Sequence, residues 1–208
     1  MSHNTHIHKV ARLTMKPFIG TSLTPNHVTT VRLLVGIAAA SCLAIGEGQW
    51  PAIGAGLFVL SVLLDRADGE LARLTNAMSP GGHQYDLVSD AICNALILIG
   101  LGIGLRESPI GDWAILYGFV AGLSVAAILW MVIKIEALDG QRSAELPSFG
   151  GFDVDDLILL IPIGIWLGWS ESLLLAAAVI TPLVVLIFII MLMRGKRTAE
   201  SKKTPKTP

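Results

Sequence analysis

The chain has 208 residues, of which 53% are hydrophobic and 15% are charged. Soluble domains carry about 25% charged residues, so this composition excludes an ordinary soluble enzyme. The 15 Lys and Arg nearly balance the 16 Asp and Glu, for a net charge of -1, which excludes a basic nucleic-acid-binding protein. We therefore expect an all-α integral membrane protein with no nucleic-acid partner.

The first 20 residues precede the apolar segments and lack the apolar core of a signal peptide. Within residues 5–19, apolar side chains recur at roughly helical spacing, opposite basic ones. This pattern predicts an amphipathic helix that lies on the membrane surface. A disordered basic arm is the alternative interpretation.

Six apolar segments follow, and they predict six transmembrane helices, because about 20 apolar residues cross the hydrocarbon core. Two uncharged stretches, 113–133 and 172–193, are long enough to span unaided. The second, third and fifth segments reach that length only by including acidic flanks, which should face a polar interior, since charge at membrane depth costs a few kcal/mol. The predicted spans are about 26–46, 49–76, 83–105, 112–136, 153–169 and 172–194.

Basic residues are concentrated in the N-terminal arm, in the loop after the fourth span and in the C-terminal tail. The loops on the opposite side hold only Arg106. The positive-inside rule then places both termini and the 77–84 turn in the cytoplasm of a multi-pass cell-membrane protein. We divide the chain into one membrane domain, 1–194, and a basic disordered tail, 195–208.

Four aspartates lie in two pairs around the turn that joins the second and third spans. On a helix, Asp65 and Asp68 share one face, and so do Asp86 and Asp90 on the next helix, because residues three or four apart are neighbours. Pro80 and Gly81 break the helix between the two pairs. The four carboxylates should therefore converge at the cytoplasmic end of a helical hairpin.

Like charges at close quarters require a cation among them. Carboxylate oxygens suit Mg²⁺ or Mn²⁺, and two such ions can hold a pyrophosphate and neutralise charge during displacement at phosphorus. Gly69, Ala72 and Gly82 have almost no side chain, so a ligand can approach the backbone there. Arg73 could bind a phosphate oxygen with its planar guanidinium. The hairpin is thus a candidate site for two divalent ions and a phosphate ligand.

The spacing D-x2-D-G-x2-A-R-x8-G-x3-D-x3-D, from Asp65 to Asp90, resembles the signature of the CDP-alcohol phosphotransferase family of phospholipid synthesis. The resemblance also covers the six-helix plan and the segment 24–29 at the start of the first span. It implies transfer of a substituted phosphate, such as phosphatidyl, from a CDP-alcohol donor to a small alcohol acceptor, with release of CMP. It further implies two divalent ions, contact with membrane lipid and a homodimer.

The same resemblance implies roles for individual residues. Asp65, Asp68 and Asp86 would bind one metal ion, and Asp65, Asp86 and Asp90 the second. Asp90 would also act as the general base that takes the proton of the acceptor hydroxyl. The residues expected around the CDP donor are Asn26, Thr29, Asp68, Gly69, Ala72, Arg73, Ser79 and Gly82.

The sequence leaves the acceptor open. Lys134 and Arg142 are weak candidates for acceptor binding, and Arg32 is a further available cation. The acidic segment 153–156 stands where relatives with a phosphorylated acceptor have arginines, which favours a neutral or amine-bearing alcohol. The lipid portion could enter with the donor or with the acceptor. The rival hypothesis is a divalent-cation transport protein that uses intramembrane carboxylates.

Overall fold

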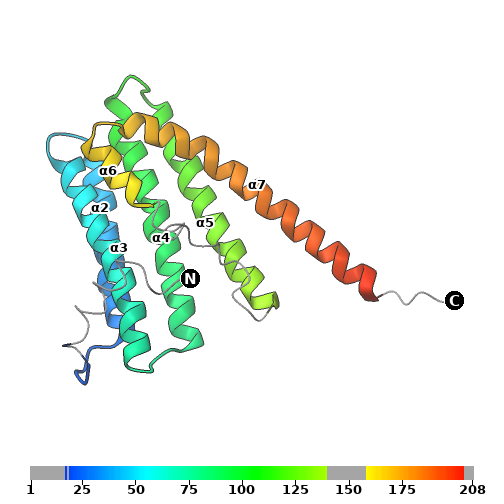
Figure 1. Cartoon of the computed structure of the whole chain (residues 1–208). Coiled ribbons are helices and arrows are strands. Elements are labelled where there is room, and N and C mark those ends of the chain that lie inside the picture. The colour runs from blue at the N-terminus through cyan, green and yellow to red at the C-terminus, as the bar shows by residue number, and fades with distance from the viewer. Residues whose placement is uncertain (1–16, 18, 140–157, 204–208) are drawn as a thin grey trace.

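The computed structural model describes residues 17, 19–139 and 158–203, and these residues form helices joined by turns, with no strand among them. The helices run alternately up and down a bundle (Figure 1). Their bounds are α2 Pro25–Ile45, α3 Trp50–Leu74, α4 Pro80–Gly104, the short 3-10 helix η2 Leu105–Glu107, α5 Trp113–Asp139, α6 Leu160–Trp166 and α7 Ser170–Lys203.

The local sequence explains where α2 and α4 begin. Thr24 caps α2, because its hydroxyl accepts a hydrogen bond from the backbone N–H of His27, and Pro25 follows at the first helical position. Ser79 caps α4 in the same way, through the N–H of Gly82, and is followed by Pro80. At its other end α2 stops at Gly46, whose φ of 77° is left-handed.

In the bundle, α2 packs against both α3 and α4, α4 packs against α5, and α5 packs against α7. Small residues permit the close approach of α4 and α5. A Cβ at Gly118 would lie 2.8 Å from the carbonyl oxygen of Leu98, and one at Gly122 would lie 2.6 Å from that of Ala95. The G-x3-G pair of α5 is therefore used within the chain, against α4.

Among the described residues, five helices are long and apolar enough to cross a membrane: α2, α3, α4 with η2, α5 and α7. Large apolar side chains are exposed on their outer faces, among them Leu34, Leu123 and Val179. A soluble protein would bury most such surface, whereas a bilayer solvates it. The chain is thus a multi-pass membrane protein.

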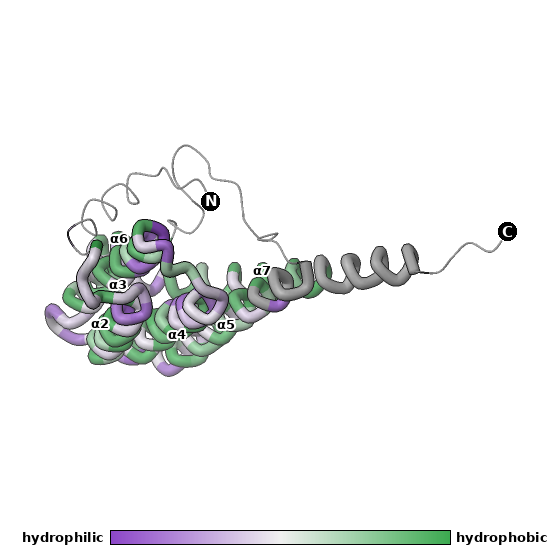
Figure 2. Tube along the Cα trace, turned by 90° about the horizontal axis from the view of Figure 1, so that it is seen from below, coloured by the Kyte–Doolittle hydropathy of each residue, from purple (hydrophilic) through white to green (hydrophobic). Residues whose placement is uncertain are grey.

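The last helix is the least enclosed. In Figure 1, α7 leans away from the other helices, and in Figure 2 its coloured residues lie at the edge of the bundle beside α5. Of its most apolar stretch of 18 residues, only 6% is buried inside the molecule. The predicted fifth span, 153–169, begins outside the described residues. Its described part forms only the seven-residue α6, which packs against α3 through a hydrogen bond from Trp166 Nε1 to the Ala52 carbonyl.

The count of six spans therefore remains a prediction, and so does the division of the chain into domain and tail. The N-terminal amphipathic helix falls, apart from residues 17 and 19, on residues outside those described.

Candidate metal centre

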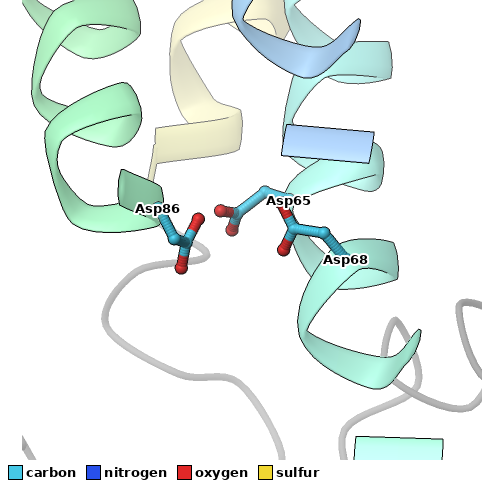
Figure 3. A group of neighbouring side chains, drawn as sticks. All are labelled: Asp65, Asp68 and Asp86. Carbon is cyan, nitrogen blue, oxygen red and sulfur yellow. The ribbon is translucent and has the colours of Figure 1, made fainter. Parts of the chain in front are cut away.

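The two predicted pairs of aspartates meet between α3 and α4. Because α3 is continuous through this region, Asp65 and Asp68 lie one turn apart on the same face. Asp86 lies opposite them on α4, and the three side chains point toward one another (Figure 3). One oxygen from each carboxylate lies within 4.8 Å of the other two. The structure thus brings these three predicted ligands together.

Asp90 is one turn beyond Asp86 on α4 and joins the cluster through a shared partner. The guanidinium of Arg32, on α2, donates through Nη1 to Asp86 Oδ1 and through Nη2 to Asp90 Oδ1, and its Nη1 also forms an ion pair with Asp65 Oδ1, each over 2.6 Å. Asn94 also donates to Asp90 Oδ1, over 3.0 Å. All four aspartates therefore belong to one polar cluster in the half of the bundle where α2 and α4 begin and α3 ends.

The cluster has a closed side and an open side. The side chain of Arg32 is only 2% exposed, whereas those of Asp65, Asp86 and Asp90 are 24%, 36% and 35% exposed. Ser61, on α3, donates to the backbone carbonyl of Arg32 over 3.2 Å and ties this turn of α2 to α3. The arginine therefore lies on the core side of the cluster, and the carboxylates retain an accessible side.

Thr29 supports Asp68 from α2. Its hydroxyl donates to Asp68 Oδ2 over 2.7 Å, and both residues are buried. The sequence predicts Thr29 as a residue of the donor pocket. In the structure its hydroxyl donates to one of the predicted metal ligands, and its contact with a donor stays a prediction.

Three further residues predicted to bind the donor, Gly69, Ala72 and Arg73, lie in the last turns of α3. Arg73 Nη2 pairs with the buried Glu70 over 2.8 Å, and Arg73 Nε has no hydrogen-bond partner among the described residues although it is buried. Gly69 leaves room beside this guanidinium, since a Cβ there would lie 3.7 Å from Arg73 Nη2. Ala72 is on the same helix and is half-buried. Arg73 thus presents an unused donor beside a small residue.

Asn26, Ser79 and Gly82 come together where α2 and α4 begin. A Cβ at Gly82 would lie 3.0 Å from Ser79 Oγ and 3.3 Å from Asn26 Oδ1. The absence of a side chain at Gly82 therefore lets these two polar groups approach the first turn of α4. Ser79 also stabilises the start of α4, because it is the N-cap of that helix.

Of the two residues predicted to bind the acceptor, the structure describes only Lys134. Lys134, on α5, is exposed, and its ammonium lies 5.4 Å from the centre of the Trp130 ring, a cation–π contact. Arg142 falls outside the described residues. Arg32, which the sequence leaves available for a phosphorylated acceptor, is instead engaged with three aspartates.

The donor set fits a divalent ion. The three clustered ligands are all carboxylates, the type that Mg²⁺ and Mn²⁺ prefer. Oxygens on opposite sides of one such ion lie about 4.2 Å apart, from bonds of about 2.1 Å, and the observed limit of 4.8 Å is close to that value. The three carboxylates are therefore close enough to one another to share an ion.

Arg32 is the site residue that the sequence analysis did not place. The sequence does contain a signal that could have placed Arg32 in the site, because Arg32 follows Thr29 by three positions and so shares its helix face. A charged side chain within an apolar span faces the interior and requires a partner. Which acids serve as that partner depends on packing between helices.

The fold and the cluster together define a multi-pass membrane protein with a carboxylate-rich candidate metal centre. A family model, CDP-alcohol phosphatidyltransferase, matches residues 22–182. The chain therefore belongs to the CDP-alcohol phosphatidyltransferase family, as its signature predicts.

Two relatives and one solved structure are similar to this chain. A bifunctional IPC transferase and DIPP synthase of Rubrobacter xylanophilus is 26% identical over 178 residues, which cover 86% of this chain and 39% of the relative. Cholinephosphotransferase 1 of Gallus gallus is 36% identical over 107 residues, which cover 47% of this chain and 32% of the relative. The chain thus spans about two fifths or less of these relatives.

The solved structure is that of phosphatidylinositol phosphate synthase from Mycobacterium tuberculosis in complex with manganese and citrate. It covers 88% of each chain with a TM-score of 0.62 and 21% sequence identity. This likeness shows that the two proteins share a fold.

Proposed function

We propose that this chain transfers a substituted phosphate group, such as phosphatidyl, from a CDP-alcohol to a small acceptor alcohol, with release of CMP, in phospholipid biosynthesis. The observation that carries the proposal is the convergence of Asp65, Asp68 and Asp86 within 4.8 Å at one end of a membrane bundle of this family. A cation pathway needs polar groups along the whole span, whereas these acids all lie in one half of the bundle. The enzyme is therefore favoured over the transport protein.

The four aspartates would hold two divalent ions, Mg²⁺ or Mn²⁺. The oxygen-only donor set supports this assignment, as does the manganese bound to the M. tuberculosis protein. Such ions, when bound, neutralise charge on a pyrophosphate. Asp65, Asp68 and Asp86 would serve one ion, and Asp65, Asp86 and Asp90 the other.

Around the ions, the chain would position the CDP donor by its own groups. Arg73 Nε, which is buried and has no hydrogen-bond partner in the described part of the chain, suits a phosphate oxygen, while Glu70 pairs with Nη2 of the same guanidinium. Gly69, Ala72 and Gly82 would let the donor approach the backbone, and Asn26, Thr29 and Ser79 complete the proposed pocket. Lys134 and Arg142 stay weak candidates for the acceptor.

In the reaction, the acceptor oxygen would form a bond to the phosphorus atom that carries the substituent, while the bond to the CMP oxygen breaks. The acceptor proton would pass to the Asp90 carboxylate, which acts as the general base. Arg32 and Asn94 both donate to Asp90 Oδ1, and these contacts would orient the carboxylate for that role.

We further propose that the protein resides in the cell membrane, with the site and both termini toward the cytoplasm, and that it forms a homodimer. The excess of basic residues on that side supports the orientation. The dimer rests on family resemblance.

A CMP-release assay tests the function. The purified chain is incubated with CDP-diacylglycerol and Mg²⁺ or Mn²⁺, and the acceptors glycerol phosphate, inositol, inositol phosphate, serine and choline are compared. We expect one acceptor to stimulate CMP release, and EDTA to abolish it until metal is restored. Mn²⁺ flux into liposomes, without CMP release from any CDP-alcohol, would overturn the enzyme in favour of a transport protein.

A further inference from the structure

Arg32 is the only basic residue seen in contact with three of the four aspartates among the described residues, and its position suggests a role that the signature does not contain. We propose that Arg32 is a positioning residue, a permanent cation on the core side of the cluster that holds Asp65, Asp86 and Asp90 together while divalent ions are absent. This inference rests on the metal site of the proposed function.

The geometry uses both terminal nitrogens of the guanidinium. Nη1 bridges Asp65 on α3 and Asp86 on α4, and Nη2 binds Asp90, each at 2.6 Å. One side chain on α2 thereby fixes carboxylates on both helices of the hairpin. A lysine cannot do the same, because its charge is centred on one nitrogen.

The balance of charge gives Arg32 its importance in the metal-free state. Four carboxylates at the end of an apolar bundle repel one another strongly, because their field is poorly screened there. Arg32 supplies one positive charge against this repulsion and is itself buried, so it cannot exchange its partners for water. Metal ions arriving from the accessible side of the carboxylates would then add to Arg32 rather than replace it.

A specific consequence follows for metal binding. Removal of Arg32 should destabilise the metal-free protein far more than the metal-loaded protein, where the ions themselves offset the carboxylates. Added metal should therefore stabilise the variant more than it stabilises the wild type. Turnover by the variant should nevertheless fall, because Asp90 loses its contact with Nη2. An arginine with a merely structural role would lower stability equally in both states.

The test compares thermal unfolding of the full chain in detergent, stripped of metal with EDTA and dialysed, before and after titration with Mn²⁺. The five tryptophans provide the signal. We expect the Mn²⁺-induced rise in Tm to be larger in Arg32→Lys than in the wild type and largest in Arg32→Met. The apparent Mn²⁺ affinity of Arg32→Met should rise on the order of tenfold, because a repelling charge near the ions is removed.

Arg106→Met is the matched control. Arg106 donates to the carbonyls of Ala44 and Ile103, over 3.1 Å and 3.0 Å, at the opposite end of α2 and α4. Its loss should lower Tm equally with and without Mn²⁺. CMP release by Arg106→Met should stay at the wild-type level.

An Mn²⁺-induced rise in Arg32→Met that equals or falls below that of the wild type overturns the proposal. If Arg32→Met does not fold with or without Mn²⁺, the Mn²⁺-induced rise in Tm of Arg32→Lys is compared with that of the wild type instead, and an equal or smaller rise again overturns the proposal. If Mn²⁺ does not raise the Tm of the wild-type chain, the metal site is absent and both proposals are overturned. A wild-type chain that responds to Mn²⁺ but releases no CMP overturns the proposed function alone.

Discussion

The hydrogen bond from Thr29 to Asp68 gives the sharpest test of how α2 supports the candidate metal centre. The Thr29 hydroxyl has one proton and two acceptors within reach, the Pro25 carbonyl at 3.1 Å and Asp68 Oδ2 at 2.7 Å. The carboxylate is nearer and charged, so it takes the proton. Thr29→Val keeps the shape of the side chain and removes this donor.

The expected loss can be estimated from the surroundings. Thr29 and Asp68 are 2% and 3% exposed, so water cannot replace the missing donor. A hydrogen bond to a charged group contributes about 1.5–3 kcal/mol, and we expect Thr29→Val to lower the free energy of unfolding by this amount. Because a hydrogen-bond partner of a metal ligand also fixes its orientation, Mn²⁺ affinity should fall by about 10–100-fold.

The assay is Mn²⁺ titration followed by thermal unfolding, with CMP release measured in parallel. Thr29→Ser retains the hydroxyl and should stay near the wild type. Thr30→Val is a matched control, because Thr30 is exposed and its hydroxyl contacts Asn26 and Tyr85 rather than a carboxylate. Equal Mn²⁺ affinity in Thr29→Val and Thr29→Ser would refute the reasoning. Thr29→Val should lower the Mn²⁺ affinity, whereas Arg32→Met should raise it, because Thr29 carries no charge that repels the ions.

Two further predictions concern the base and the packing of α4 on α5. Asp90→Asn keeps an oxygen acceptor for Arg32 and Asn94, so the protein should fold and bind the CDP donor while turnover falls by about 10²–10⁴; retained turnover would exclude Asp90 as the base. Gly118→Ala places a Cβ 2.8 Å from the Leu98 carbonyl and should cost about 1–3 kcal/mol of stability. Gly56→Ala, where a Cβ meets nothing within 4 Å, is its control in the same thermal unfolding experiment, and equal Tm values would contradict the packing argument.

The sequence by itself determined the class of protein and the acidic hairpin. Apolar length and low charge are local properties, and they require a membrane bundle before any tertiary contact is known. The spacing of Asp65, Asp68 and Asp86 is equally local, because helical periodicity places residues three and four apart on one face. Family membership and the convergence of these three carboxylates were both predicted from that spacing.

Only the tertiary structure decided which groups complete the cluster. Arg32 meets Asp86 and Asp90 across 54 and 58 residues of chain, and Thr29 meets Asp68 across 39. The rotation of α2 about its axis selects these partners, and its many apolar residues suit either lipid or protein, so the sequence does not specify that rotation. The same reason applies to Gly118, whose spacing suits a dimer contact or an internal one, and which packing with α4 places inside the bundle.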